Sequence, residues 1–230
     1  MILDNFPKVL WINLEQSVDR RKYMEELFNS RGINHTRISA ISGLDKINPE
    51  LNAFCKMNLG LKPVENACTC SHLKALKYFV EKMTDDKIII FEDDVSFEFL
   101  EYIPFNWSEL EKKFPENYTV IQLAIFTKQT ITNDLVKFDR KKPYYCTTAY
   151  LITRTAAKKI LQHYFSKSSK KFDLSNKYFP VADFVMYILP NTYSIPIFTY
   201  LGVDSTIQPA YLDIHRASKQ QQLDLWKKID

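Results

Sequence analysis

The hydrophobic residues of the chain gather into short runs, and their pattern predicts an α/β fold. Residues 88–91 read I-I-I-F, and four consecutive large apolar residues suit a strand buried on both faces rather than one face of a helix. Residues 9–14, V-L-W-I-N-L, form a run of the same type, and residues 33–41 read as the next strand. With a helix between these two strands, the chain is expected to open on a right-handed parallel β-α-β unit.

The first predicted helix begins near Ser17 and ends before Gly32, because serine favours a helix start and glycine the position just past a helix end. Its charged positions, among them Arg20 and Arg21, face water or a ligand. Its buried stripe follows helical spacing and consists of Met24, Leu27 and Phe28.

Residues 43–66 mix glycine, proline and polar residues, and they predict a long loop with one short helix at about 51–57. A longer helix is expected to start at Thr69 and to deliver the chain to the strand at 88–91. Its first turn would then hold donors and a cation near a helix N-terminus, an arrangement suited to anionic oxygen. These residues are Ser71, His72 and Lys74.

The remaining patterns predict further strands at residues 118–124, 147–153 and 195–201 and a helix at 154–164. We therefore expect a central, mostly parallel sheet flanked by helices, in the manner of a Rossmann-like fold. Neither a repeat nor a shift in composition marks a boundary. Residues 1–230 are predicted to form a single domain, with its core at about 8–205 and a polar helical tail at 206–230.

Composition narrows the classes of ligand. The chain of 230 residues has a formal net charge of +4 and only four glycines, against sixteen phenylalanines and thirteen tyrosines. Because glycine-rich phosphate loops are absent, side chains, a metal or helix N-termini must hold any phosphate. No element combines a basic stripe with interleaved aromatic residues, so nucleic acid is not an expected partner.

The cysteines and the chain ends predict a soluble protein in a reducing compartment. Cys68 and Cys70 are separated by one residue, which matches neither the usual spacing of zinc sites nor a redox pair. All four cysteines are interpreted as reduced packing residues. The sequence shows no signal peptide and no apolar run long enough for a membrane span, so the expected location is cytoplasmic, and the oligomeric state stays open.

Carboxylates follow the strand at 88–91 directly: Glu92, Asp93 and Asp94. Ligands of open α/β sheets bind outside the carboxyl ends of strands, and three adjacent acids resist burial unless a cation compensates them. A hard divalent metal would do so, whereas the alternative is a solvated acidic turn. Asp183 is the only acid in the apolar stretch 179–189, where a carboxylate is costly unless it is paired or used.

Five motifs in order make the chain resemble glycosyltransferase family 25, which includes bacterial lipopolysaccharide galactosyltransferases and the collagen galactosyltransferase domain. They are I-N-L-E-Q-S-V-D-R-R-K-Y-M at 12–24, E-N-A-C-T-C-S-H-L-K-A-L at 65–76, E-D-D at 92–94, A-Y-L-I-T-R-T-A-A-K-K-I-L at 149–161 and P-V-A-D at 180–183. Three features depart from the family. In V-A-D at 181–183 the apolar lead is extra short, where the family often shows an acidic residue directly after one aliphatic residue. Ala67 replaces a glycine, and the C-terminal signature is only faintly echoed by G-V-D-S-T-I at 202–207.

The resemblance implies a GT-A-like fold and the transfer of galactose or glucose from a UDP-sugar, with inversion, to a hydroxyl of a glycan or of a hydroxylysine-type protein acceptor. It implies assistance from Mn²⁺ or Mg²⁺, and carboxylates favour such metals. The metal ligands expected are Asp94, Glu92 and His215, and the catalytic base expected is Asp183. The donor-binding residues expected are Asn13, Leu14, Asp19, Arg20, Arg21, Ser71, His72, Lys74, Glu92 and Asp93.

Each assignment has a structural alternative. Arg20 and Arg21 could be helix-surface charges, His72 a core histidine with satisfied hydrogen bonds, and Asp183 a helix cap. The whole chain could also be a catalytically inactive relative that binds a nucleotide-sugar or a glycan. If it is an enzyme, a cytoplasmic role in glycan assembly fits a bacterium or a virus in its host.

Overall fold

The computed structural model describes residues 3–44, 48–201 and 212–228. Within them, the main sheet has eight strands in the order β2-β1-β4-β8-β6-β11-β5, and β7 pairs with β11. The strands are β1 (Val9–Asn13), β2 (His35–Ser39), β4 (Lys87–Glu92), β5 (Val95–Ser96), β6 (Val120–Ala124), β7 (Val136–Lys137), β8 (Ala149–Thr153) and β11 (Thr192–Tyr200). A small sheet joins β3 (Cys55–Lys56), β9 (Phe165–Ser166) and β10 (Lys171–Asp173).

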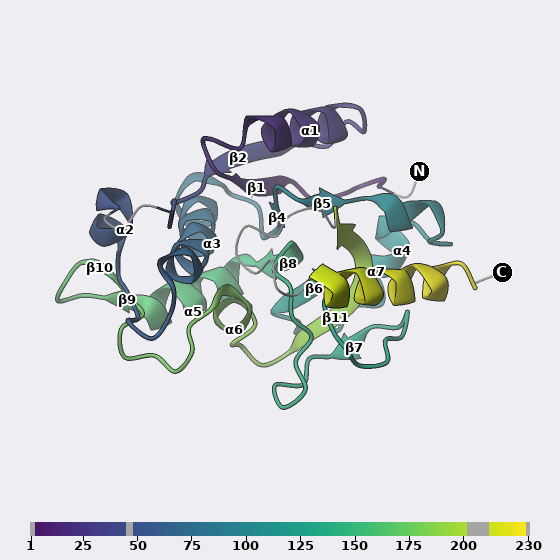
Figure 1. Ribbon diagram of the computed structural model, residues 1–230. Helices are drawn as coiled ribbons and strands as arrows, with labels where there is room; N and C mark the ends of the chain where they lie inside the picture. Colours follow the sequence, from purple (N-terminus) through teal and green to yellow (C-terminus); the bar gives the residue numbers. More distant parts are fainter. Residues whose placement is uncertain (1–2, 45–47, 202–211, 229–230) are drawn as a thin grey trace.

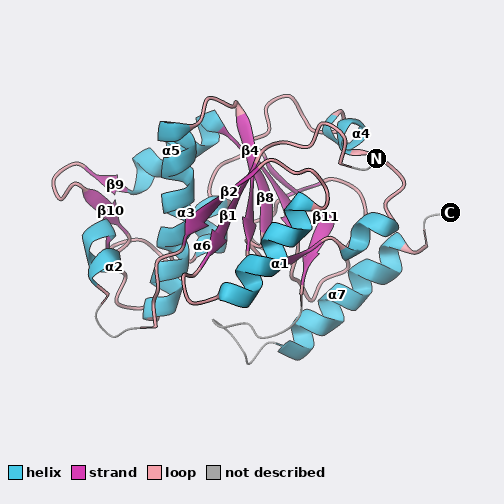
Figure 2. Cartoon of the chain, turned by 90° about the horizontal axis from the view of Figure 1, so that it is seen from above, coloured by secondary structure: helices cyan, strands magenta, loops and turns pink. Residues whose placement is uncertain are grey.

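The strand directions confirm a mixed α/β fold with a mostly parallel sheet. Strands β2, β1 and β4 are parallel neighbours, and β6 and β11 are parallel to each other. Between β4 and β6 lies β8, which is antiparallel to both. The strands fan out through the centre of the molecule, with helices outside them (Figure 2).

Helices cover both faces of the sheet, as the two apolar faces of its central strands require. The side chains of Ile88 and Ile90 share one core with α3 (Pro63–Lys82), α5 (Arg154–Tyr164) and α6 (Ala182–Met186). The side chains of Ile89 and Phe91 share the other core with α1 (Val18–Asn29), η1 (Glu98–Glu101), α4 (Trp107–Glu111) and α7 (Leu212–Trp226). Figure 1 shows α3 and α5 side by side, with the short α2 (Pro49–Phe54) near them. No helix in the described ranges is long and apolar enough to cross a membrane.

The start of α3 corrects one sequence prediction. The helix begins at Pro63 and not at Thr69, because proline suits the first helical position and the carboxylate of Glu65 accepts the backbone N–H of Lys62 over 2.7 Å. Ser71, His72 and Lys74 therefore lie in the middle of a helix. The expected anion site at a helix N-terminus was wrong for these three residues.

Candidate active site

A pocket lies at the carboxyl ends of the parallel strands β1, β2 and β4, where open α/β sheets bind ligands. The first turn of α1 and the amino-terminal half of α3 also line it. Its lining includes eight residues predicted from the sequence: Asn13, Leu14, Arg20, Ser71, His72, Glu92, Asp93 and Asp94. The strand at 88–91 is central, and the acidic triplet lies at its carboxyl end, as the sequence predicted.

Asp93 is held through both of its carboxylate oxygens. Nη1 of Arg20 donates to Oδ1 over 2.9 Å, and Nδ2 of Asn13 donates to Oδ2 over 2.6 Å. Asn13 is in turn oriented by Arg37, whose Nε donates to its Oδ1 over 2.9 Å. Burial lowers the pKa of Arg20, but the hydrogen bond and the charge of Asp93 outweigh that effect and raise it. The role of Arg37 has no signal in the sequence, since only the pairing of β1 with β2 brings this residue to Asn13.

Glu92 is paired with a buried histidine. Its Oε1 lies 3.1 Å from Nε2 of His72 and accepts the hydroxyl of Thr147 over 2.6 Å. Burial raises the pKa of Glu92, but the hydrogen bonds of His72 and Thr147 and the charge of Arg20 reverse the effect and leave the pKa below its usual value. Glu92 is therefore an ionised carboxylate with established partners.

Asp94 has the weakest compensation of the three acids. The hydroxyl of Thr148 donates to its Oδ1 over 3.4 Å, at the long end of the hydrogen-bond range. Burial, followed by the charges of Glu92 and Asp93, raises the pKa of Asp94 to about 7. A carboxylate in that environment favours either a proton or a cation.

His72 and Ser71 are buried in α3, with 1% and 3% of their surface exposed. Nδ1 of His72 lies 3.0 Å from the hydroxyl of Tyr150, so both of its ring nitrogens have partners. The hydroxyl of Ser71 donates to the carbonyl of Ala67 over 2.8 Å and accepts the backbone N–H of Ile41 over 2.9 Å. The matched S-H pair therefore supports the floor of the pocket from within the helix.

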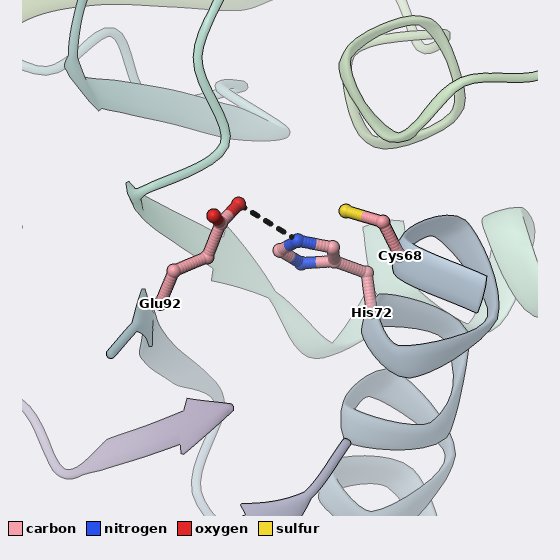
Figure 3. A group of neighbouring side chains, drawn as sticks. All are labelled: Cys68, His72 and Glu92. Carbon is pink, nitrogen blue, oxygen red and sulfur yellow. Dashed lines mark hydrogen bonds and ion pairs between the residues drawn. The ribbon is translucent and has the colours of Figure 1, made fainter. Parts of the chain in front are cut away.

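Cys68 joins His72 and Glu92 at the pocket wall. One ligand atom from each of the three side chains lies within 4.8 Å of the other two, and Figure 3 shows the thiol, the ring and the carboxylate facing a common space. The cysteines in the described structure are free. The interpretation as packing residues fits the buried Cys55 and Cys70, whereas Cys68 also lines the pocket.

Asp183 lies in the first turn of α6. Its side chain does not cap that helix, since the N-cap is Val181, and its Oδ1 accepts the backbone N–H of Cys146. Burial raises the pKa of Asp183, against the lowering effect of that N–H, and the charge of Glu92 raises it further. The carboxylate of Asp183 is thus desolvated, although Asp183 is not part of the pocket lining.

Other predicted site residues are not part of the pocket lining, although Nε of Arg21 donates to Oδ1 of the lining residue Asn13 over 3.3 Å. Asp19 is exposed on α1, Arg21 pairs with Glu15 over 2.9 Å, and Lys74 pairs with Glu50 of α2 over 2.7 Å. His215 lies in α7, where its ring stacks on Phe126 with 4.0 Å between centroids. The role of His215 as a metal ligand stays a prediction.

The family assignment follows from a match over most of the chain. The model of glycosyltransferase family 25, described as an LPS biosynthesis protein family, matches residues 6–176. The chain belongs to glycosyltransferase family 25. The match includes every pocket residue described above, whereas Asp183 and His215 lie beyond it. No curated protein has a significant match to this family 25 chain.

Solved structures similar to this family 25 chain include three transferases. A glycosyltransferase involved in the glycosylation of the major capsid of PBCV-1 is 9% identical and aligns over 93% of this chain and 98% of its own, with a TM-score of 0.49. The inositol-1-phosphate CTP transferase from T. maritima is 15% identical and aligns over 99% of this chain and 80% of its own, with a TM-score of 0.42. Mouse xyloside xylosyltransferase 1 is 13% identical and aligns over 91% of this chain and 80% of its own, with a TM-score of 0.35. None of these three reaches a TM-score of 0.5, so the assignment depends on the family match.

Proposed function

We propose that the protein transfers a hexose, galactose or glucose, from a UDP-sugar to a hydroxyl group of a glycan or protein acceptor with inversion at the anomeric carbon. One observation carries the proposal: four separate segments of a family 25 chain converge on one pocket at the carboxyl ends of β1, β2 and β4. They supply an amide, a guanidinium, an imidazole and three carboxylates. A nucleotide diphosphate with a metal needs such a combination of anionic and cationic groups.

In this proposal, the Arg20–Asp93–Asn13 network binds the nucleotide part of the donor. Arg20 lies at the pocket with its guanidinium held by Asp93, and a guanidinium is a suitable partner for a phosphate or ribose oxygen. Asn13 and Arg20 orient Asp93, and an oriented carboxylate can accept a ribose hydroxyl. The proposal also includes three residues that do not line the pocket: Arg21, Asp19 and Lys74. They would contact parts of the UDP-sugar that extend beyond the pocket.

The carboxylates fit Mn²⁺ or Mg²⁺. Oxygen ligands suit these hard cations, and the raised pKa of Asp94 reflects a negative charge that its protein neighbours leave uncompensated. We assign Asp94 as the first ligand, Glu92 as a direct or water-mediated partner and His215 as a further candidate. When bound, the cation would stabilise the negative charge of the departing diphosphate.

Asp183 is the proposed general base. Its carboxylate takes the proton of the acceptor hydroxyl while the acceptor oxygen forms a bond to the anomeric carbon. The bond from that carbon to the diphosphate oxygen breaks, and UDP leaves with the electron pair. Burial raises the pKa of Asp183, which brings the proton affinity of the carboxylate closer to that required of a base at neutral pH.

The test is a screen for UDP release from a panel of UDP-sugars, with Mn²⁺, with Mg²⁺ and with chelator, in the absence and presence of candidate acceptors. Metal-dependent release from one donor, increased by an acceptor, would support the proposal. The rival function is a catalytically inactive nucleotide-sugar or glycan-binding protein. Calorimetric binding of UDP without release from any donor would favour that rival and overturn the proposed transfer.

A further inference from the structure

Cys68, His72 and Glu92 bring three different ligand types to one point of the pocket wall. Cys68 and His72 are four residues apart on α3, so one helical turn places their side chains on the same face. Glu92 approaches from the end of β4, and the three ligand atoms lie within 4.8 Å of one another (Figure 3). The hard-cation site predicted from the sequence includes neither the thiol of Cys68 nor the imidazole of His72.

The spacing of the nitrogen and oxygen ligand atoms fits a tetrahedral metal. Nε2 of His72 and Oε1 of Glu92 are 3.1 Å apart. Zinc bonds to nitrogen and oxygen are about 2.0–2.2 Å long, so a tetrahedral zinc holds two such ligands about 3.3 Å apart. A metal between the ring and the carboxylate therefore requires only a small shift of these side chains.

The surroundings of the imidazole also suit a metal ligand. Metal-binding histidines usually have a partner at their second ring nitrogen, which fixes the ring and its tautomer. Nδ1 of His72 lies 3.0 Å from the hydroxyl of Tyr150, and with Nε2 on a metal the Nδ1–H would donate to that oxygen. The ring is 1% exposed, so packing also fixes its orientation.

The charges around the thiol favour a cation. The carboxylates of Glu92, Asp183 and Asp94 act on the thiol of Cys68, so the thiol lies in a region of negative charge. A coordinated divalent metal compensates those charges and deprotonates the thiol outright. Cys68 lines the pocket, which gives an ion access from solvent.

We propose that Cys68, His72 and Glu92 bind Zn²⁺ through Sγ, Nε2 and a carboxylate oxygen, with the fourth position open to the pocket. The proton of the thiol and any proton on Nε2 pass to water when the metal binds. A thiolate selects zinc over Mg²⁺ and Mn²⁺. Because Glu92 belongs to this site and to the proposed hard-cation site, zinc would withdraw that carboxylate from the latter.

Cobalt(II) provides the test, because a thiolate bound to this ion gives a charge-transfer absorption in the near ultraviolet. The band should appear when Co²⁺ is added to metal-free protein, should disappear on addition of Zn²⁺, and should be absent in Cys68→Ala and in the near-isosteric Cys68→Ser. Competition with a chromogenic chelator should show that zinc binds either variant about a hundredfold or more weakly, since even outer-shell changes cost 10- to 100-fold.

Cys70→Ala is the matched control, because Cys70 lies two residues away on the same helix and is buried with Cys55. The control should keep the cobalt band and the zinc affinity. Absence of the band in the wild-type protein, its retention in both Cys68 variants, or its loss only in Cys70→Ala would overturn the proposal. The measurement uses neither donor nor acceptor, so its outcome is independent of the proposed sugar transfer.

Discussion

Arg20 and Asp93 form an ion pair, with 2.9 Å between Nη1 and Oδ1, that joins the first turn of α1 to the turn after β4. Asn13 at the end of β1 holds the second oxygen of the carboxylate over 2.6 Å. Asp93 is thus positioned by residues of β1 and α1, which lie 80 and 73 residues from it in the chain. The first and third sequence motifs are one hydrogen-bonded unit.

The Arg20→Ala variant should bind UDP about tenfold more weakly or worse. The change removes a cation from the pocket and leaves Asp93 with one partner, and hydrogen bonds to charged groups contribute about 1.5–3 kcal/mol. Titration calorimetry with UDP and Mn²⁺ measures the effect. Lys22→Ala, an exposed charge on the same helix, is the control and should bind normally. Equal affinity in Arg20→Ala would make Arg20 a structural partner of Asp93 only.

The Asp94→Asn variant should lose the stimulation of UDP binding by Mn²⁺ while the protein stays folded. An amide keeps the volume of the side chain but removes the charge that a hard cation requires. Calorimetry with Mn²⁺ and with chelator, alongside circular dichroism, separates loss of the metal from loss of the fold. If wild-type UDP binding is the same in chelator, the assigned metal role is wrong.

Asp94 should also make the metal-free protein less stable as the pH rises. Its pKa is about 7 in the folded state against 3.8 ordinarily, so between these values unfolding releases a proton and the free energy of unfolding falls with pH. Asp94→Asn has no carboxyl group at this position, so it lacks this contribution to the pH dependence of the free energy of unfolding. In urea titrations with chelator, the variant should be more stable than wild type at pH 7.5, and the difference should vanish near pH 4. A difference that does not change with pH would contradict the prediction.

The Asp183→Asn variant should transfer sugar about a hundredfold more slowly or worse, the usual effect of losing a general base. Binding of UDP should survive, because the base contacts the acceptor. Asparagine can still accept the N–H of Cys146, so the local structure has a substitute bond. Single-turnover transfer and UDP calorimetry on the same preparation check both parts. Transfer near the wild-type rate would place the base elsewhere.

Ser71→Ala should lower the free energy of unfolding by about 1–3 kcal/mol, because it leaves the buried N–H of Ile41 without its acceptor. Urea denaturation gives the value. Ser168→Ala, in an exposed loop, should change stability by less than about 0.5 kcal/mol. Wild-type stability in Ser71→Ala, together with weaker UDP binding, would instead indicate direct contact with the donor.

Local pattern predicted the central elements well. Four apolar residues at 88–91 form the core of β4, and the helix expected at 154–164 has those bounds. In both segments, burial and local preference favour the same structure. The start of α3 was not predicted, since the mixed residues K-P-V-E-N at 62–66 are also typical of a loop. In the structure, Pro63 and Glu65 lie in the first turn of the helix. The reversed direction of β8 depends on long-range pairing, which periodicity does not encode.

The candidate site was predictable where its residues are adjacent in the sequence, and less so where residues from distant segments meet only in the fold. Three adjacent acids after an apolar strand identify the strand end, and the structure places them there. Arg37, Thr147 and Thr148 carry no local signal, since strand pairing alone brings them to Asn13, Glu92 and Asp94. Cys68 had a signal: its spacing of four from His72 places both on one helix face.

The reversed strand β8 determines where the chain can be lengthened. Because β8 runs against β4, its amino end lies beside the carboxyl end of β4, and the carbonyl of Thr148 accepts the backbone N–H of Glu92 over 2.9 Å. One residue inserted at the amino end of β8 would shift the register, so that the hydroxyls of Thr147 and Thr148 would turn to the opposite face of the strand. Upstream, Phe126 and Tyr145 pair through two backbone hydrogen bonds at the base of residues 127–144, a segment that includes β7. New sequence can therefore enter this segment outside β7 without altering the pairing of β8 with β4 or the carboxylates at the end of β4.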